Sequence, residues 1–338
     1  MRLQFQFLET VNGLDNSNSQ IITGIRGQLD KATTAPGMVM ISLSAVALGA
    51  AFGGYLPLIS LWMETFNISF QRIGIVCGAS AVGVVSSAYF APKLAARYGY
   101  ILTINVGLVV AAIMTVAFRF TDNYGLWLAL RFVSGLGLGL HWVLTEAWLA
   151  NIVTEKYRTR VMAIYATAIS IGFAIGPMVI WLFGALSIIP FIIMGALLIL
   201  AALPILRLKG HEPKDSQTRS ASPLILIKKA PTVASACIVV GSVDLALISL
   251  LPAMITRTPE AAPILALIIV PAMAIGATIL QYPIAIIADK HGLRKVGVMT
   301  VCAGLIFASL IPFFLGSVLL TLLFGFLAAG LVLSLIHI

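Results

Sequence analysis

Long apolar runs recur along this sequence, and they limit what the chain can fold into more than any other feature. A helix that crosses a bilayer needs about 20 consecutive apolar residues, and most of these runs reach that length. Hydrophobic residues make up 60% of the chain and charged residues 10%, whereas a soluble domain has about 25% charged residues. The chain is therefore expected to be an all-α bundle of transmembrane helices.

The runs fall into two sets with one hydrophilic segment between them, which is a two-halved arrangement. We expect a cytoplasmic tail at 1–36, an N-terminal six-helix bundle at 37–206, a cytoplasmic linker at 207–230 and an incomplete C-terminal bundle, helices 7–10, at 231–338. The expected spans are 37–63, 73–93, 101–118, 125–151, 161–183, 186–206, 231–255, 262–288, 296–315 and 316 onward.

Lys and Arg predict the orientation of these spans, because cytoplasmic loops carry an excess of them. With the N-terminus in the cytoplasm, the outward loops hold only Arg72, Arg119 and Arg257. The inward loops then hold Lys93, Arg97, Lys156, Arg158, Arg160, Arg207, Lys209, Lys214, Arg219, Lys228, Lys229, Lys290, Arg294 and Lys295. We expect a multi-pass protein of the cell (inner) membrane. The net charge of +9 is explained by this orientation, so we expect no nucleic-acid partner.

A short repeat closes the second span of each set. LAARYGY at 94–100 corresponds to IADKHGL at 287–293, 193 positions later. Each copy is a short basic turn in which glycine permits a tight reversal. The same offset places the fourth span of the second half from 318 to beyond Ile338, so the chain is expected to be truncated at its C-terminus.

This turn is similar to the signature loop of the major facilitator superfamily, Gly-x-Leu-Ala-Asp-Arg-x-Gly-Arg-Lys. The first copy keeps Arg97 and Gly99 but has Pro92 and Ala96 in place of the motif's first glycine and its aspartate. The second copy is fuller and has Asp289, Lys290, Gly292, Arg294 and Lys295. The resemblance implies that these loops lock the helices together at the cytoplasmic side. The loop of the first copy lacks the aspartate of this lock.

Three further stretches resemble the same family. RFVSGLGLG at 131–139 resembles its fourth-helix pattern of Arg followed by glycines, which is linked to proton coupling in drug/proton antiporters. Gly172-x-x-x-Gly176-Pro177 resembles the fifth-helix antiporter motif, although the two glycines that follow in the motif are absent. EAWL at 146–149 is similar to the Glu-Ser-Trp-Leu that ends the fourth helix of an uncharacterised branch. The resemblance covers most of the chain after residue 37 and implies two pseudo-symmetric six-helix halves.

Three ionisable residues, Arg131, His141 and Glu146, lie in the apolar span 125–151. Charge at membrane depth costs at least a few kcal/mol, so such groups normally face a protein interior or a water-filled cavity. Arg131, Trp142 and Glu146 share one arc of the helical wheel with two glycines, and His141 lies to one side of it. This arc is predicted to pack closely against a neighbour along the glycines and to face the substrate or proton pathway.

Each of these side chains has a functional and a structural interpretation. Arg131 is either a partner for an anionic substrate or titrating carboxylate, or an arginine bound to carbonyls of a neighbouring helix. Glu146 lies about 22 Å further along the same face, so it cannot pair with Arg131. It is either a proton site or, as the favoured interpretation, a latch partner for a cytoplasmic arginine. His141 is able to titrate near physiological pH but is better explained as a packed neutral residue, and Trp142 either stacks on a ligand or packs.

Asp244 is the only acidic residue near the middle of a span, the seventh. The resemblance implies that this helix lines a central cavity. Removal from water favours the neutral form of a carboxylate, and a nearby cation favours the charged form. Asp244 is therefore the predicted proton carrier, with a hydrogen-bonded structural aspartate as the alternative. Pro57, Gly172, Gly176 and Pro177 are the predicted helix hinges, since glycine and proline permit kinks.

Together these features predict a secondary active transporter of a small molecule that is driven by protons and works by alternating access. We find no HExxH, GxSxG, P-loop or dinucleotide fingerprint, so we expect no enzyme activity, cofactor or metal site. The expected partners are a small-molecule substrate, protons and the lipid bilayer, and the chain is expected to be a monomer. The alternative is a non-transporting receptor or scaffold on the same fold. Drug-like efflux and sugar or metabolite uptake fit the motifs equally well.

Overall fold

The computed structural model describes residues 36–153, 155–210, 212–213 and 231–337 of the chain. The expected tail and most of the expected linker lie outside these ranges. Within them every regular element is a helix, and nine helices are long and apolar enough to cross a membrane. The predicted all-α transmembrane bundle is confirmed.

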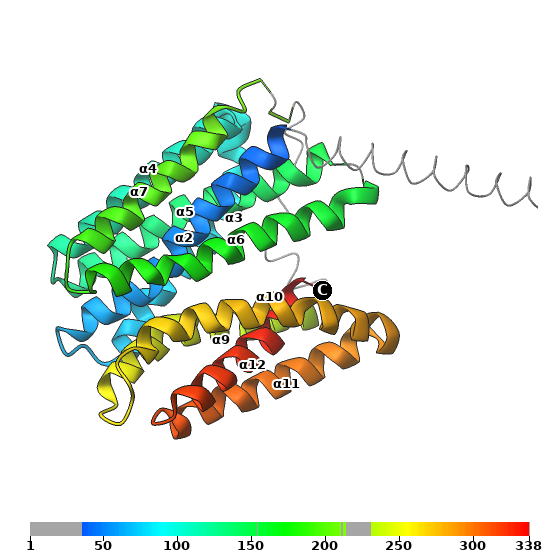
Figure 1. Ribbon diagram of the computed structural model, residues 1–338. Coiled ribbons are helices and arrows are strands. Elements are labelled where there is room, and N and C mark those ends of the chain that lie inside the picture. The colour runs from blue at the N-terminus through cyan, green and yellow to red at the C-terminus, as the bar shows by residue number, and fades with distance from the viewer. Residues whose placement is uncertain (1–35, 154, 211, 214–230, 338) are drawn as a thin grey trace, which may run out of the picture.

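The helices form two groups (Figure 1). The first group, the N half, comprises α2 (Pro36–Glu64), α3 (Phe70–Tyr98), α4 (Tyr100–Ala117), the 3-10 turn η1 (Phe118–Phe120), α5 (Tyr124–Ile152), α6 (Glu155–Phe183) and α7 (Ile189–Leu206). The second group, the C half, comprises α9 (Pro231–Arg257), α10 (Leu265–His291), α11 (Leu293–Leu310), the 3-10 turn η2 (Ile311–Phe314) and α12 (Val318–His337).

The repeat is visible in where the helices end. Helices α3 and α10 stop at Tyr98 and His291, and each is followed by a single glycine before the next helix begins. Gly99 and Gly292 have φ of 84° and 89°, which is the left-handed region that glycine adopts without steric cost. Their N–H groups donate to the carbonyls of Ala95 at 2.8 Å and Ala288 at 2.9 Å. The two turns are therefore built in the same way.

Small residues bring helix backbones together in the N half. A Cβ atom on Gly172 of α6 would collide with the carbonyl oxygen of Val46 on α2, and one on Gly176 would collide with that of Ala50. In membranes, where lipid is as apolar as the side chains, such close contacts are a main source of helix association. Helices α2 and α6 consequently form one tightly packed pair.

Helix α5 packs in the same manner against α3, as the glycine arc predicted. A Cβ on Gly135 would collide with the carbonyl oxygen of Ser80, and one on Gly139 would lie 2.8 Å from the Cα of Val84. The glycine part of the arc is thus covered by α3. Only the part of the arc beyond the glycines, with Trp142 and Glu146, is left partly exposed.

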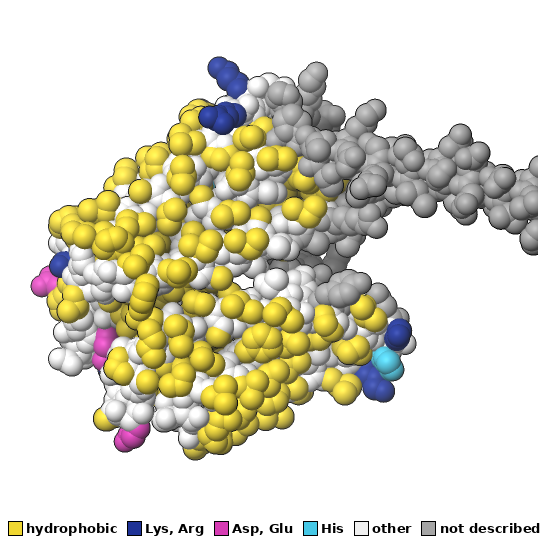
Figure 2. Space-filling model, in the orientation of Figure 1, with side chains coloured by type: hydrophobic (Ala, Val, Ile, Leu, Met, Phe, Trp, Pro, Cys, Tyr) yellow, Lys and Arg dark blue, Asp and Glu magenta, His cyan; other side chains and the backbone are white. Residues whose placement is uncertain are grey.

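The two halves meet through α9, which packs against α2 and α3, and through α10, which packs against α6. Phe52 of α2 and Phe173 of α6 pack against a C-half core that includes Ile248 and Leu251 of α9. Broad apolar surfaces cover both halves on the face shown in Figure 2. Phe313, for example, is 80% exposed. Surfaces of this size are unfavourable in water and fit a bilayer.

Candidate functional site

Arg131 is completely buried in the N half, at 0% exposure. Its guanidinium carbon lies 4.8 Å from the ring centroid of Tyr55 on α2. In the described part of the chain, none of its three side-chain nitrogens has a hydrogen-bond partner. The predicted structural alternative, binding to carbonyls of a neighbouring helix, is absent from that part. A buried cation with an aromatic ring beside it but no anion or hydrogen-bond acceptor is costly, so this position favours an anionic or water partner.

Trp142 and Glu146 form a pair one helical turn apart on α5. The indole Nε1 of Trp142 donates to the carboxylate Oε1 of Glu146 at 2.6 Å. The Trp142 ring meets the ring of Phe52 edge-on at 6.2 Å, and Phe52 meets Phe173 at 5.8 Å. An acidic group held by a tryptophan thus lies beside three aromatic rings from α2, α5 and α6, at the border with the C half.

The predicted cytoplasmic latch of Glu146 has no arginine partner in the described part. Arg97 instead places its guanidinium carbon 5.3 Å from the ring centroid of Tyr98. The side chains of Arg158 and Arg160 lie outside the described part. The latch role of Glu146 therefore stays a prediction.

His141 directly precedes Trp142 on α5 and contacts Ser44 of α2. The Ser44 hydroxyl donates to the carbonyl of Ala201 at 2.6 Å. Because a hydroxyl has one hydrogen, it accepts from His141 Nε2 at 2.8 Å, and Nε2 therefore carries a proton. His141 is 0% exposed. This placement agrees with the packed histidine that its off-arc position suggested.

Asp244 lies midway along α9 and is half-buried. Its Oδ1 is sealed from solvent and has no hydrogen-bond partner in the described part. It is not ion-paired with Arg131 or with any other cation described. This oxygen therefore does not support the alternative interpretation, in which Asp244 is a hydrogen-bonded structural residue.

A further pair, which the sequence analysis did not single out, joins the two halves. Arg257 at the end of α9 forms an ion pair with Glu64 at the end of α2. Its Nη2 also donates to the carbonyl of Ile68 at 2.7 Å, and its guanidinium carbon lies 4.2 Å from the Phe70 ring centroid. The repeat offset alone signals this pair, because Glu64 and Arg257 are 193 residues apart.

The predicted gate residues lie where α3 and α10 end, at the other end of the bundle from the Glu64–Arg257 pair. Arg97 and Lys290 belong to the last turns of α3 and α10, so the loop proper is one glycine, Gly99 or Gly292. Helix α3 runs past the expected end of its span because its last turn carries basic residues that reach out of the apolar layer. The side chains of two other predicted gate residues, Asp289 and Arg294, lie outside the described part.

The predicted hinge residues lie within unbroken helices. Helix α2 continues through Pro57, and α6 continues through Pro177. Gly172 and Gly176 contact α2 closely, as described above, and this packing is sufficient reason for glycine at both positions. A hinge role stays a prediction.

Comparison with known proteins identifies the family. The sequence model of the Major Facilitator Superfamily matches residues 41–338. The chain belongs to the major facilitator superfamily. This family consists of membrane transporters and not of enzymes, so the expectation of a non-enzymatic membrane protein is confirmed.

Relatives in this superfamily are distant. The chain is 26% identical over 273 residues to the uncharacterized MFS-type transporter YfkF of Bacillus subtilis (strain 168), covering 79% of this chain and 68% of that protein. It is 24% identical over 220 residues to an uncharacterized MFS-type transporter of Yersinia pestis (strain Pestoides F), covering 64% of this chain and 55% of that protein. The chain thus spans roughly half to two thirds of these superfamily members.

Solved structures of superfamily transporters share the fold. A bacterial homolog of the human lysosomal transporter Spinster, inward-facing and occupied, has a TM-score of 0.68 at 20% identity, covering 88% of this chain and 72% of that one. A mutant of the nucleoside transporter NupG has a TM-score of 0.72 at 16% identity, covering 88% and 80%. At such identities the likeness establishes the major facilitator fold and leaves the cargo open.

Proposed function

We propose that this chain is part of a secondary active transporter that moves a small molecule by alternating access and is driven by protons. The observation that carries the proposal is the placement of Arg131 and Asp244. Each is an ionisable group inside a membrane-spanning helix, the two lie on opposite halves, and neither has an ionic partner in the described part. Such groups in membrane helices normally serve ion or substrate pathways.

In this proposal Asp244 carries the proton. It is neutral while dry, and it releases the proton when movement of the halves admits water or brings a cation near. Arg131 is fixed in the N half and supplies positive charge to the pathway. Glu146 is the second candidate proton site, with its charge tuned by the hydrogen bond from Trp142.

The substrate is proposed to bind near Phe52, Trp142 and Phe173. Aromatic faces with one nearby carboxylate suit a small organic molecule that has an apolar or planar part and a polar group. The structural neighbours include a nucleoside transporter and a D-xylose-proton symporter, so the fold accommodates polar organic cargo.

The arrangement of the two halves supports an inward-open conformation, in which the space between them opens towards the cytoplasm. The halves are joined by Arg257 where α2 and α9 end, and α6 and α10 diverge towards the opposite end (Figure 1). That opposite end carries Arg97, Arg207 and Lys290 and is proposed to be cytoplasmic, with the N-terminus inside, by the positive-inside rule. The proposed membrane is the inner membrane of a bacterial cell, and the proposed working unit is a monomer.

The test is solute flux into proteoliposomes that hold the complete gene product, with and without an imposed pH gradient, over a panel of radiolabelled sugars, nucleosides and cationic dyes. We expect at least one solute to accumulate only with the gradient. Asp244→Asn should abolish that accumulation. If Asp244→Asn and Arg131→Ala both left gradient-driven flux unchanged, the proposal would fail in favour of a receptor or scaffold on the transporter fold.

A further inference from the structure

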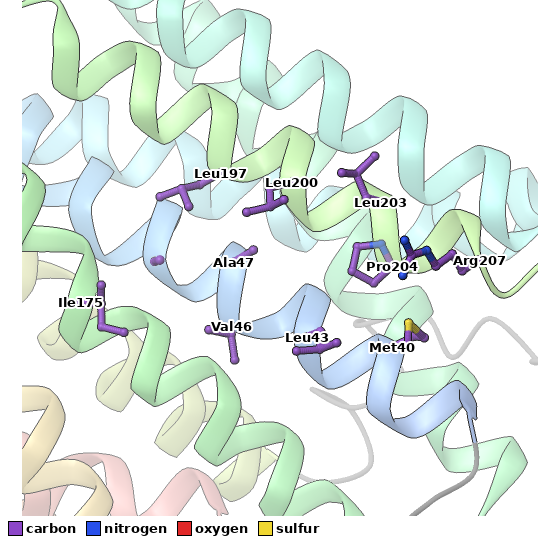
Figure 3. A pocket seen from close by; sticks show the side chains of 11 residues that line it. Met40, Leu43, Val46, Ala47, Ile175, Leu197, Leu200, Leu203, Pro204 and Arg207 are labelled. Carbon is purple, nitrogen blue, oxygen red and sulfur yellow. The ribbon is translucent and has the colours of Figure 1, made fainter.

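An apolar groove runs along the outside of the N half, between α6 and α7. The two helices diverge towards the basic end, and α2 forms the floor between them (Figure 1). The groove has a volume of about 490 Å³. Leu197, Leu200 and Leu203 follow one another along its α7 wall, and Ala47 lies on its floor (Figure 3).

This groove opens outward and not into the space between the halves. Its rim residues Leu43 and Leu200 are 52% and 51% exposed, and Ile175 on the α6 side is 47% exposed. The C half contacts α6 through α10 and α2 through α9, so no described C-half helix fills the groove. Its surroundings in a membrane are therefore lipid.

The groove has one polar end. Arg207, directly after the last turn of α7, is the single charged residue that lines it, and every other described lining side chain is apolar. Ten residues separate Leu197 from Arg207, which is about 15 Å along a helix. This length is about half of the hydrocarbon thickness of a bilayer, which is about 30 Å. The groove thus spans one leaflet and ends in a cation at headgroup depth.

We propose that this groove is a binding site for an anionic phospholipid of the leaflet on the basic side. One acyl chain lies on α2 between the α6 and α7 walls, and the phosphate binds the guanidinium of Arg207. A guanidinium fits a phosphate through paired N–H donors. Basic pockets between helices on the cytoplasmic side are suited to anionic lipid headgroups. Lys209 lies two residues beyond Arg207 and does not line the groove, so it provides a matched control.

The test is native mass spectrometry of the purified full chain, delipidated in detergent and offered dioleoyl phosphatidylglycerol and dioleoyl phosphatidylcholine in equal amounts. We expect about fivefold preferential retention of the anionic lipid, as one well-placed basic residue supplies. Arg207→Gln should lose this preference, and Lys209→Gln should keep it. Arg207 is exposed, so its substitution leaves the core intact.

A second variant tests the acyl chain independently of the charge. Leu200→Trp fills the exposed wall of the groove and should lower retention of both lipids, with a monodisperse elution profile as the folding control. Equal retention of the two lipids by the unmodified chain would overturn the proposal, as would retention of no lipid, which would mean that something else occupies the groove. Unchanged preference in Arg207→Gln would also overturn it.

Discussion

Glu64 and Arg257 occupy the same position in the two repeats, 193 residues apart, and form an ion pair with each other. Each is the last residue of the first helix of its half. Because the two residues hold equivalent positions in the two halves, their contact lies near the pseudo-two-fold axis that relates the halves. In the described part of the chain this is the single ion pair, and it holds the two halves together at one end.

The first prediction concerns this pair. Glu64→Gln should shift the population towards states that are open at the Glu64 end, because it removes an ionic contact between the halves. The side chains of Glu64 and Arg257 are 17% and 33% exposed, so solvent partly screens the pair and it contributes up to about 1 kcal/mol. Its loss should change the ratio of open to closed states at this end by up to about fivefold.

The measurement is the distribution of distances between two spin labels, one on each half, placed near the ends of α2 and α9 where Glu64 and Arg257 lie. The reversed double variant Glu64→Arg with Arg257→Glu should move the distribution back towards the original one, because it restores the ionic contact without the contacts of Arg257 with Ile68 and Phe70. An unchanged distribution in Glu64→Gln would show that the pair does not bias the equilibrium.

The second prediction separates stability from function at Arg131. Replacing it with methionine removes a buried cation that, in the described part, has the Tyr55 ring beside it but no anionic or hydrogen-bond partner, and should raise the free energy of unfolding by about 1–4 kcal/mol. The same change should abolish transport, because the positive charge in the pathway is lost. Thermal unfolding in detergent and flux in proteoliposomes provide the two readouts. A destabilised variant would indicate that unseen partners already satisfy the guanidinium.

The third prediction concerns the packing of α2 on α6. Gly172→Ala should lower the free energy of unfolding by about 1–3 kcal/mol, because the added methyl collides with the backbone carbonyl of Val46. Gly78→Ala is the matched control, since Gly78 is also inside a helix but a Cβ there meets nothing within 4 Å. The control should be neutral or slightly stabilising. Equal effects of both changes on denaturation would contradict the packing account.

The fourth prediction tests the aromatic site. Trp142→Phe keeps a ring against Phe52 but removes the donor to Glu146 Oε1. We expect flux of the transported solute to persist with an altered pH dependence, because the carboxylate loses the hydrogen bond that favours its charged form. The measurement is flux against pH for Trp142→Phe and the unmodified chain, and superimposable profiles would show that the hydrogen bond does not tune Glu146.

The sequence alone was sufficient for features set by local chemistry. The turns at Gly99 and Gly292 were predictable because a one-residue reversal between helices needs positive φ, and the shared motif marked both. The close approach of a neighbouring backbone at Gly135 was predictable because a row of glycines on one helix face permits it, whereas the identity of that neighbour, α3, was not.

Contacts between distant helices were not predictable in this way. Nothing local to Arg131 indicates that its neighbour is Tyr55, since which face of α5 meets α2 depends on how all six helices pack. Phe52 and Phe173 were missed for the same reason, because aromatic residues in apolar spans have no distinguishing pattern. The helical wheel also grouped Arg131 with Glu146, yet α3 covers the glycines between them and divides that face into two environments.

The central claim is that Asp244, inside α9, faces a water-accessible passage between the halves. The most direct measurement is labelling of Asp244→Cys by a charged, membrane-impermeant thiol reagent applied to the basic side, with Cys77, Cys237 and Cys302 replaced by serine. Val109→Cys is the control, because Val109 lies at mid-span on the outer surface of α4 and is 41% exposed. The account predicts that Asp244→Cys reacts and Val109→Cys does not; an unreactive Asp244→Cys from both sides of the membrane would contradict it.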